Sequence, residues 1–247
     1  MVIGGGIAGL VAADAAAGAG WQVTLVEREP QLMSHASGRN AAIYRPLEAP
    51  AVVTALATAA APLLDELCGG RAAWLRPTGL LLTAAHGGSL DELSRIAAAH
   101  GIAAQALDRA ALLARAPLLA GGPCAAALWL PGAGVIDNHA VGQALERRIT
   151  ARGGVITRSN AVVRIEPRGA RVDAVVVGDE RLAADVVVIA GGAWAAALGA
   201  TVGAPLVLTP MRRHLAMLTV DAPLAPAAPT VWDVELGCYW RPEAGEP

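Results

Sequence analysis

The first thirty residues change their hydrophobic pattern twice, and each change marks an expected element. Val2 and Ile3 have the character of the end of a buried strand, and a glycine-rich turn follows from Gly4 to Gly9. The apolar stretch from residue 7 to residue 17 has helical length and ends at two glycines, and residues 22–27 return to strand character. A strand–helix–strand opening of this kind predicts a parallel sheet.

Further elements follow from the same patterns. We expect helices after Pro50, over residues 90–100, after an Asp108 cap and from an Asp137 cap to about residue 152. Strands are expected as a bent pair over 74–83 and at 125–130, 155–157, 162–165, 172–177, 186–190, 205–220 and 238–242. The proline-rich residues 222–229 are expected to form a surface connection.

Composition excludes several classes of protein. Hydrophobic residues make up 55% and charged residues 16% of the 247, which argues against disorder. The net charge of −2 gives no electrostatic footprint for nucleic acid or an anionic membrane. All 19 basic residues are arginine, so no lysine is present to form a Schiff base.

Cysteine spacing and hydropathy bear on compartment. Cys68, Cys124 and Cys238 are far apart and predict neither a metal site nor a disulfide framework. The N-terminus lacks the basic region of a signal peptide. The apolar residues 56–67 contain Pro62 and two acidic residues, so we expect a helix of a soluble protein and no transmembrane segment. These features favour a cytoplasmic location, with peripheral association at the inner membrane left open.

The opening turn carries a dinucleotide fingerprint. Gly4, Gly6 and Gly9 form GxGxxG between strand and helix, an arrangement that lets backbone approach a pyrophosphate at a helix N-terminus. Glu27 ends the second strand, where a carboxylate accepts hydrogen bonds from ribose hydroxyls and repels a 2′-phosphate. Arg28 weakens the exclusion of that phosphate. The fingerprint alone leaves FAD and NAD open, but the polar loop 34–40 and the glycine pair of VVVIAGGAW favour FAD.

Several segments together resemble the D-amino-acid oxidase superfamily of FAD-dependent enzymes, which includes glycine and sarcosine oxidases. They are VIGGGIAGL, LVERE, SHASGRNAAIY, GAGVID and VVVIAGGAW, in the family's order and spacing. MRRHLAML and GCYWRPEAG resemble substrate-domain strands of the bacterial D-arginine dehydrogenase type. The likeness extends over essentially the whole chain, whose two ends we expect to be cut, the C-terminal one more seriously.

The resemblance implies an α/β fold. A Rossmann-like FAD/NAD(P)-binding domain (residues 1–72 and 132–203) would be interrupted by a smaller, incomplete α+β substrate domain with an antiparallel sheet (73–131 and 204–247). It also implies FAD-dependent oxidation of the CH–NH bond of an amino acid or secondary amine by hydride transfer to flavin N5. The resulting imine would hydrolyse to a keto acid and ammonia.

Site residues carry over by motif match. The cofactor would contact Gly4, Gly6, Ala8, Gly9, Glu27, Arg28, Ala36, Ser37, Gly38, Arg39, Asn40, Ala41, Ala42, Ile43, Val162 and Gly191. Arg213 and Tyr239 would bind the substrate carboxylate, with Tyr44 a further candidate, and no metal is expected.

Two positions depart from the pattern. Ile43 stands where the family has a histidine. Thr78 stands where the cationic-substrate type has an acid. Because Thr78 offers no charge to a cationic side chain, we expect small or apolar neutral substrates. The resemblance also implies a C-terminal part that supplies another carboxylate-binding arginine. We expect this part to be cut from the present sequence, so the sequence leaves both the substrate and the activity of this chain open.

Alternatives stay open for the residues and for the function. Arg213 has a structural alternative in a cross-sheet salt bridge, and Tyr44 and Tyr239 have one as core rings. An FAD enzyme acting on a 2-hydroxy acid or glycerol phosphate is a second function, and a non-catalytic truncated flavin-binding fragment is a third. The sequence leaves oxygen and a quinone equally open as electron acceptor.

Overall fold

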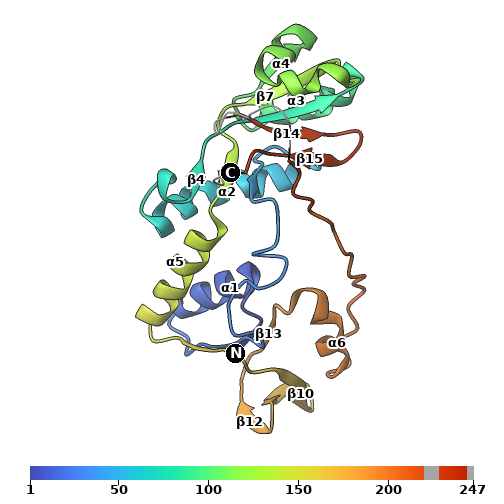
Figure 1. Ribbon diagram of the computed structural model, residues 1–247. Helices are drawn as coiled ribbons and strands as arrows, with labels where there is room; N and C mark the ends of the chain where they lie inside the picture. Colours follow the sequence, from blue (N-terminus) through green and yellow to red (C-terminus); the bar gives the residue numbers. More distant parts are fainter. Residues whose placement is uncertain (220–227, 244–247) are drawn as a thin grey trace. The chain divides into compact units, whose positions relative to one another are not determined.

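The computed structural model describes residues 1–219 and 228–243, and within them the chain forms two compact units. The first unit comprises residues 1–40 and 138–215, and the second comprises residues 41–137 and 216–247. The chain therefore enters each unit twice (Figure 1).

The first unit is built on a parallel sheet of four short strands in the order β13-β1-β2-β9. They are β1 (Val2–Ile3), β2 (Thr24–Val26), β9 (Val155–Thr157) and β13 (Val188–Ile189). Val2 pairs with Leu25 on one side and with Val188 on the other. The strand–helix–strand opening and the parallel sheet are thus confirmed.

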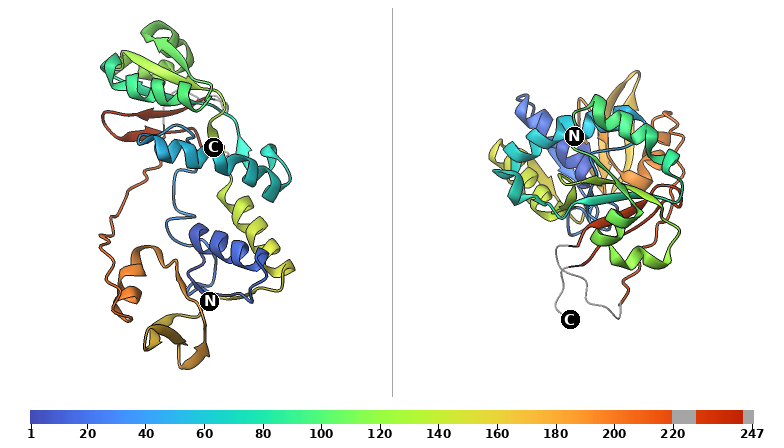
Figure 2. Two further views of the ribbon diagram at one scale, coloured as in Figure 1. Left: turned by 180° about the vertical axis from the view of Figure 1, so that it is seen from behind. Right: turned by 90° about the horizontal axis from the view of Figure 1, so that it is seen from above.

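Two helices pack against each other beside this sheet. Helix α1 (Ile7–Gly18) and helix α5 (Asn138–Ala151) lie side by side (Figure 2). Asp14 is 5% exposed and is held by Arg148 and by Arg152, whose Nη1 lies 2.7 Å from Oδ1 of Asp14. Because a buried carboxylate needs a partner, these two arginines fix α5 against α1.

An antiparallel meander completes the first unit together with a short helix. The meander is formed by β10 (Val162–Arg168), β11 (Arg171–Val177) and β12 (Glu180–Ala183), and the helix is α6 (Ala195–Ala200), preceded by the turn η4 (Gly192–Trp194). Ile165 and Val175 of the meander pack with Ile3 and Val26 of the parallel sheet in one buried cluster. The strands that flank the glycine turn are therefore supported by a buried apolar cluster.

The second unit contains a five-stranded sheet in the order β15-β14-β5-β7-β6. Its strands are β5 (Leu80–Ala84), β6 (Gln105–Asp108), β7 (Ala126–Leu130), β14 (Thr230–Asp233) and β15 (Cys238–Trp240). All neighbours are antiparallel except β14 and β5, which are parallel. Leu80 and Leu82 belong to one buried cluster and Leu81 to another, as side chains on opposite faces of a strand must.

Helices and a small sheet surround this core. The helices are α2 (Ala51–Cys68), α3 (Asp91–Ala99) and α4 (Arg109–Arg115), and the turns are η1 (Arg71–Ala73), η2 (Gly87–Leu90) and η3 (Pro117–Gly121). The small antiparallel sheet has the order β3-β8-β4, from Ile43–Tyr44, Gly134–Ile136 and Leu75–Arg76. The Asp108 cap is confirmed, since its side chain accepts a hydrogen bond from the Ala111 amide at 2.8 Å.

The compact units differ in their bounds from the predicted domains. The chain changes unit after residues 40, 137 and 215, whereas the sequence placed the boundaries after residues 72, 131 and 203. The small sheet accounts for the largest difference, because Ile43 pairs with Val135 and Leu75 pairs with Ile136. These pairings hold the whole stretch from residue 41 within the second unit.

One predicted strand is wrong. From Pro205 to Thr219 the backbone forms no strand, and Val207 and Met217 are 105% and 79% exposed; residues 220–227, which include most of the predicted proline-rich connection, lie outside the described residues. An apolar run has β character only when a neighbouring strand takes up its N–H and C=O groups. In the described part of the chain no strand pairs with this stretch.

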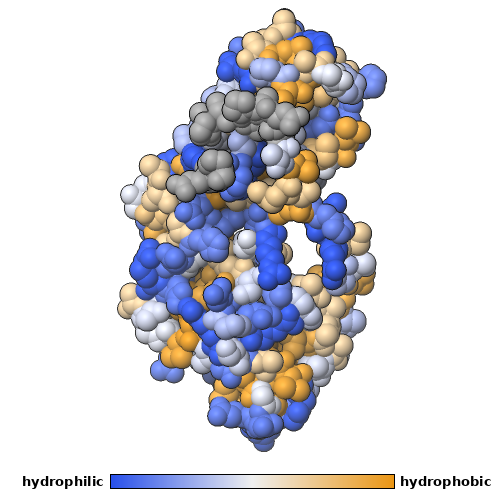
Figure 3. All heavy atoms as spheres, viewed as in Figure 1, coloured by the Kyte–Doolittle hydropathy of each residue, from blue (hydrophilic) through white to orange (hydrophobic). Residues whose placement is uncertain are grey.

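Apolar side chains also reach the surface elsewhere, and Figure 3 shows hydrophobic residues interspersed with hydrophilic ones on the face it draws. In α2, Val52, Leu56 and Leu63 are more than half exposed. Among the described helices, α2 alone is long and apolar enough to cross a membrane by length and composition.

Candidate functional site

The N-terminus of α1 is shaped by glycines that no other residue could replace. Gly4 has φ of +109°, and a Cβ added there would lie 2.4 Å from the carbonyl oxygen of Ala190. A Cβ added at Gly9 would lie 1.9 Å from the carbonyl oxygen of Gly4. The turn is therefore packed against β13 and against its own helix, and the first-turn amides of α1 are left without carbonyls four residues earlier.

The polar loop closes onto this turn. Oγ of Ser37 accepts a hydrogen bond from the Ile7 amide at 2.9 Å, and a Cβ at Gly6 would lie 3.0 Å from the same oxygen. Ser37 thus replaces the N-cap side chain that Gly6 lacks. The polar loop and the glycine turn therefore lie side by side in the first unit.

Glu27 lies directly beneath the turn and is 8% exposed. Its Oε2 accepts from the Gly5 amide at 2.5 Å, and its Oε1 accepts from the Glu29 amide at 2.8 Å. A carboxylate has about four acceptor positions. Two are occupied by backbone, which fixes the side chain and leaves the others for the two hydroxyls of a ribose.

These groups line one cavity of about 660 Å³ in the first unit. Nine of the predicted cofactor residues line it: Gly4, Gly6, Ala8, Glu27, Arg28, Ala36, Ser37, Val162 and Gly191. Its size is ordinary for a cofactor or small-molecule site. The cavity offers backbone amides for phosphates, a fixed carboxylate for a ribose and apolar walls for a flat ring, so the residues present fit the ADP part of a dinucleotide.

Other predicted cofactor residues do not line this cavity. Gly9 packs behind the turn, and Gly38, Arg39 and Asn40 belong to the first unit outside the cavity lining. Ala41, Ala42 and Ile43 belong to the second unit, where the Ala41 carbonyl accepts from Nε of Arg241 at 2.6 Å. Their cofactor roles stay predictions.

Sequence reasoning missed a group at the cavity wall. Trp194 of η4 and His35 of the polar loop both line the cavity beside Arg28. The Arg28 guanidinium lies 3.6 Å from the centre of the Trp194 ring. The centre of the His35 ring lies 4.7 Å from the centre of the same Trp194 ring. The only signal in the sequence was the position of Trp194 two residues after the glycine pair Gly191–Gly192.

The predicted substrate residues lie on different elements. Tyr239 of β15 stacks on Trp232 of β14, with ring centres 4.4 Å apart. Tyr44 packs edge-on against Trp74 at 5.1 Å, and burial raises the pKa of its phenol. Arg213 is exposed on the irregular stretch that follows residue 204.

Arg45 was not predicted, and it is a partly buried cation that lies against one of these rings. Its guanidinium lies 4.2 Å from the centre of the Trp232 ring and pairs with Glu48, while Nε donates to the Leu47 carbonyl at 3.2 Å. Burial lowers its pKa below the ordinary value. Arg45 therefore holds the chain after β3 against β14.

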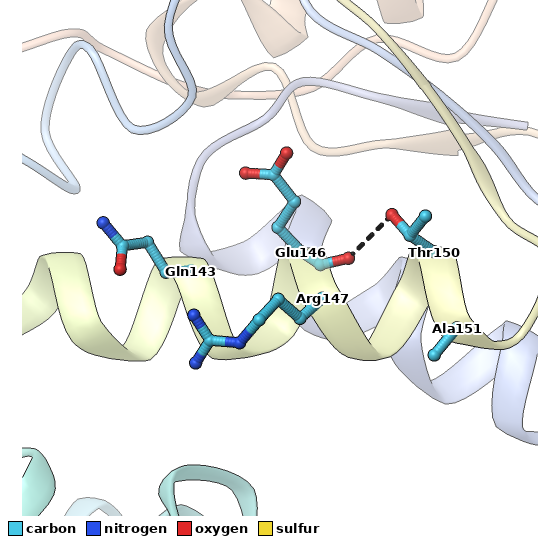
Figure 4. Close-up of a pocket in the computed structure, with 5 residues that line it drawn as sticks. All are labelled: Gln143, Glu146, Arg147, Thr150 and Ala151. Carbon is cyan, nitrogen blue, oxygen red and sulfur yellow. Dashed lines mark hydrogen bonds between the residues drawn. The ribbon is translucent and has the colours of Figure 1, made fainter.

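A second hollow carries no comparable chemistry. It lies along one side of α5, where Gln143, Glu146, Arg147, Thr150 and Ala151 line it (Figure 4). Its lining comes from one helix, and the hydroxyl of Thr150 donates to the Glu146 carbonyl of the same helix at 3.0 Å. In the described part of the chain no group of three or more His, Cys, Asp and Glu side chains is placed to hold a metal ion.

Comparisons with known proteins agree with this geometry. The sequence model of the family described as FAD dependent oxidoreductase (DAO) matches residues 1–246. A glycine oxidase of Geobacillus kaustophilus is 32% identical over 143 residues, covering 57% of this chain and 36% of that protein. Its crystal structure superimposes with a TM-score of 0.74 at 26% identity, covering 99% of this chain and 68% of that one.

Two further relatives widen the range. A tRNA 5-methylaminomethyl-2-thiouridine biosynthesis bifunctional protein MnmC of Burkholderia multivorans is 30% identical over 251 residues, covering 94% of this chain and 36% of that protein. The L-proline dehydrogenase structure from P. horikoshii gives a TM-score of 0.77 at 19% identity, covering 96% of this chain and 65% of that one. The chain thus spans 36% of the length of each of these curated relatives. The family resemblance, the fold class and FAD as the family's cofactor are confirmed.

Proposed function

The chain belongs to the DAO family of FAD dependent oxidoreductases, and from this premise we propose that the cavity of its first unit binds the ADP part of FAD. The observation that carries the proposal is the convergence of the glycine turn, Ser37 and Glu27 on one cavity. Backbone amides at the N-terminus of α1 would receive the diphosphate, since the helix dipole favours negative charge there. Glu27 would receive the ribose hydroxyls.

The reaction we propose is oxidation of the CH–NH bond of an amino acid or a secondary amine. Bound FAD supplies the acceptor for the hydride that leaves the substrate's α-carbon. The substrate becomes an imine, which water hydrolyses to a keto acid and ammonia when the substrate is a primary amino acid. The side chains of this protein would bind and orient the substrate and exclude water. The relatives named as glycine oxidase and L-proline dehydrogenase support an amino-acid substrate.

Arg213 and Tyr239 are proposed to bind the substrate carboxylate, with Tyr44 a further candidate for the same role. A guanidinium pairs both oxygens of a carboxylate and so fixes the α-carbon. Support for Arg213 comes from the family resemblance of PMRRH. Its replacement by Ala in a full-length enzyme should cost roughly 2–5 kcal/mol in substrate binding. Arg212→Ala is the matched control, and a kcat/KM within about twofold of wild type for Arg213→Ala would contradict the assignment.

A neutral substrate side chain is favoured by Thr78. Its hydroxyl oxygen is buried without a hydrogen-bond partner among the described residues, and it offers no charge for a cationic side chain. Burying an unpaired ammonium is costly. A screen of amino acids and N-alkyl amino acids for imine or ammonia release should therefore favour small neutral ones, and activity led by arginine or lysine would contradict this. Including 2-hydroxy acids and glycerol phosphate tests the alternative substrate class.

A second candidate substrate is an aminomethyl group on a tRNA nucleoside. The relative named for 5-methylaminomethyl-2-thiouridine biosynthesis covers 94% of this chain, a larger share than the glycine oxidase alignment covers. The net charge of −2 gives no broad attraction to RNA. The same assay with bulk tRNA from a strain deficient in this modification, beside free glycine, separates the two candidates.

Glu27→Ala tests the cofactor site itself. Charge-assisted hydrogen bonds contribute roughly 1.5–3 kcal/mol each, so FAD affinity should fall about ten- to a hundredfold. Titration of the apoprotein with FAD, followed by flavin fluorescence, measures it. Glu180→Ala, which removes an exposed carboxylate of the same unit that does not line the cavity, is the control. Equal affinity of the Glu27→Ala and wild-type proteins would rule out the ribose role.

A further inference from the structure

The role of the Arg28 charge at the cavity is not explained by the proposed FAD site. A cation beside a ribose site usually receives a 2′-phosphate, which FAD lacks. The side chain is 36% exposed and lines the cavity next to Glu27. Its sequence position alone therefore leaves open whether it recognises a phosphate or does something else.

Two contacts occupy the Arg28 guanidinium. Its Nε donates to Oε1 of Glu29 at 3.0 Å, and its flat face lies 3.6 Å from the centre of the Trp194 ring. Glu29 neutralises the charge, and the indole covers one face. A phosphate at this guanidinium would have to compete with the Glu29 carboxylate for its charge.

His35 joins the same group from a third segment. Its Nε2 lies 2.9 Å from Oε1 of Glu29 and 3.1 Å from Nη2 of Arg28. Arg28 can only donate, so Nε2 either accepts from Arg28 or, when it carries a proton, donates to Glu29. In both states His35 keeps a partner within the group and its ring stays against Trp194.

The group joins two parts of the chain that are far apart in the sequence, residues 28–35 and the segment that contains Trp194. Arg28 and Glu29 follow β2, His35 belongs to the polar loop, and Trp194 belongs to η4. Trp194 is 44% exposed although it lines the cavity, so it stands at the opening rather than in the floor. The Trp194 ring, held there by Arg28 from the bend after β2 and by His35 from the polar loop, lies along one side of the opening.

We propose that Arg28, Glu29, His35 and Trp194 form a clasp that closes the adenosine end of the cavity, retaining the dinucleotide and selecting an unphosphorylated ribose. This rests on the proposed function, because it assumes that the ADP part of FAD occupies the cavity. The clasp acts on retention, since opening it requires the Arg28–Trp194 stack to separate. Its selectivity follows from Glu27, which repels a 2′-phosphate, together with an Arg28 charge already used by Glu29.

The test uses ADP-ribose and its 2′-phosphorylated form as probes, because they differ only in that phosphate and contain no flavin. Calorimetric titration of the wild-type chain should show ADP-ribose binding at least tenfold tighter than the 2′-phosphorylated form. Trp194→Ala should weaken ADP-ribose about tenfold, mostly through faster dissociation. Glu29→Gln leaves the Arg28 charge without its carboxylate, so this variant should reduce the preference for ADP-ribose over the 2′-phosphorylated form about threefold or more.

Trp21→Ala is the matched control, since Trp21 is another exposed tryptophan of the same unit, 56% exposed against 44% for Trp194, and it does not line the cavity. Circular dichroism confirms that each variant is folded, and Trp194→Phe replaces Trp194→Ala if the latter is not. Binding of ADP-ribose by the folded Trp194 variant within twofold of wild type overturns the clasp. Equal or tighter binding of the 2′-phosphorylated form by wild type overturns the selectivity. A wild-type chain that binds neither probe overturns the proposed function together with the clasp.

Discussion

The cavity of the first unit and the paired strands β14 and β15 of the second unit differ in how far apart in the sequence their predicted functional residues lie. Gly4, Gly6, Ser37 and Glu27 come from the first forty residues, and their backbone and side-chain hydrogen bonds are made within the unit. The predicted substrate residues are divided: Tyr239 is on β15 of the second unit, while Arg213 lies on an exposed stretch without secondary structure. The hydrogen-bonded groups of the cavity therefore come from one short stretch of chain, although residues 160–163 and 190–198 complete its walls. The predicted substrate residues come from segments that are far apart in the sequence, so their placement depends on the pairing of separate strands.

The largest effect is expected at Gly9, on the affinity of the first unit for FAD. Gly9→Ala should lower FAD affinity more than a hundredfold, because its Cβ would lie 1.9 Å from the Gly4 carbonyl oxygen and the turn would have to open. Gly18→Ala is the control in the same helix, where the nearest atom to an added Cβ is the flexible end of Arg152 at 3.0 Å. Flavin fluorescence titration measures both, and equal losses in the two variants would show that the helix, not the turn, limits binding.

A smaller effect is expected at Asp14, which tests the stability of the first unit apart from its cavity. Asp14→Ala leaves Arg148 and Arg152 without their carboxylate. Both arginines are about a third exposed, so we expect a loss of roughly 2–3 kcal/mol, below the value for a fully buried pair. Urea unfolding followed by circular dichroism measures it. Asp173→Ala, which breaks the exposed pair with Arg181, should cost less than about 1 kcal/mol.

The smallest effect concerns the second unit at acid pH. Hydrogen bonds from Ser89 and from the amides of His86 and Ala85 lower the pKa of Glu235 to about 2 from 4.5. A lowered pKa stabilises the folded state above about pH 4.5, and that contribution is lost as the pH falls towards 2. Glu235→Gln should therefore flatten the fall in stability between these pH values.

Tryptophan fluorescence during urea unfolding follows this change, because four of the six tryptophans lie in the second unit. Glu92→Gln on the exposed side of α3 is the control and should keep the wild-type pH dependence. Identical slopes for wild type and Glu235→Gln would show that the contacts between Glu235 and residues 85–89 do not hold the β14–β15 hairpin in place.

Elements that depend on residues close together in the sequence could be predicted from the sequence. The glycine turn, the strands on both sides of α1, the Asp108 cap and the helix that follows Asp137 all came from residues adjacent in sequence. The strand expected over 205–220 failed because strand character depends on a partner that this stretch does not encode. Trp194 was missed for a related reason, since its contacts with Arg28 and His35 arise only when the chain returns to the first sheet.

The central claim is that the first unit alone contains the adenosine end of the FAD site. Amide hydrogen exchange of the chain with and without saturating FAD tests it most directly, because backbone protection reports the segments that the ligand covers. The account predicts added protection at residues 4–9, 27–37, 160–163 and 190–198, all of which belong to the first unit. Protection that spares the glycine turn and Glu27, or that falls mainly on α2 and the five-stranded sheet, would contradict it.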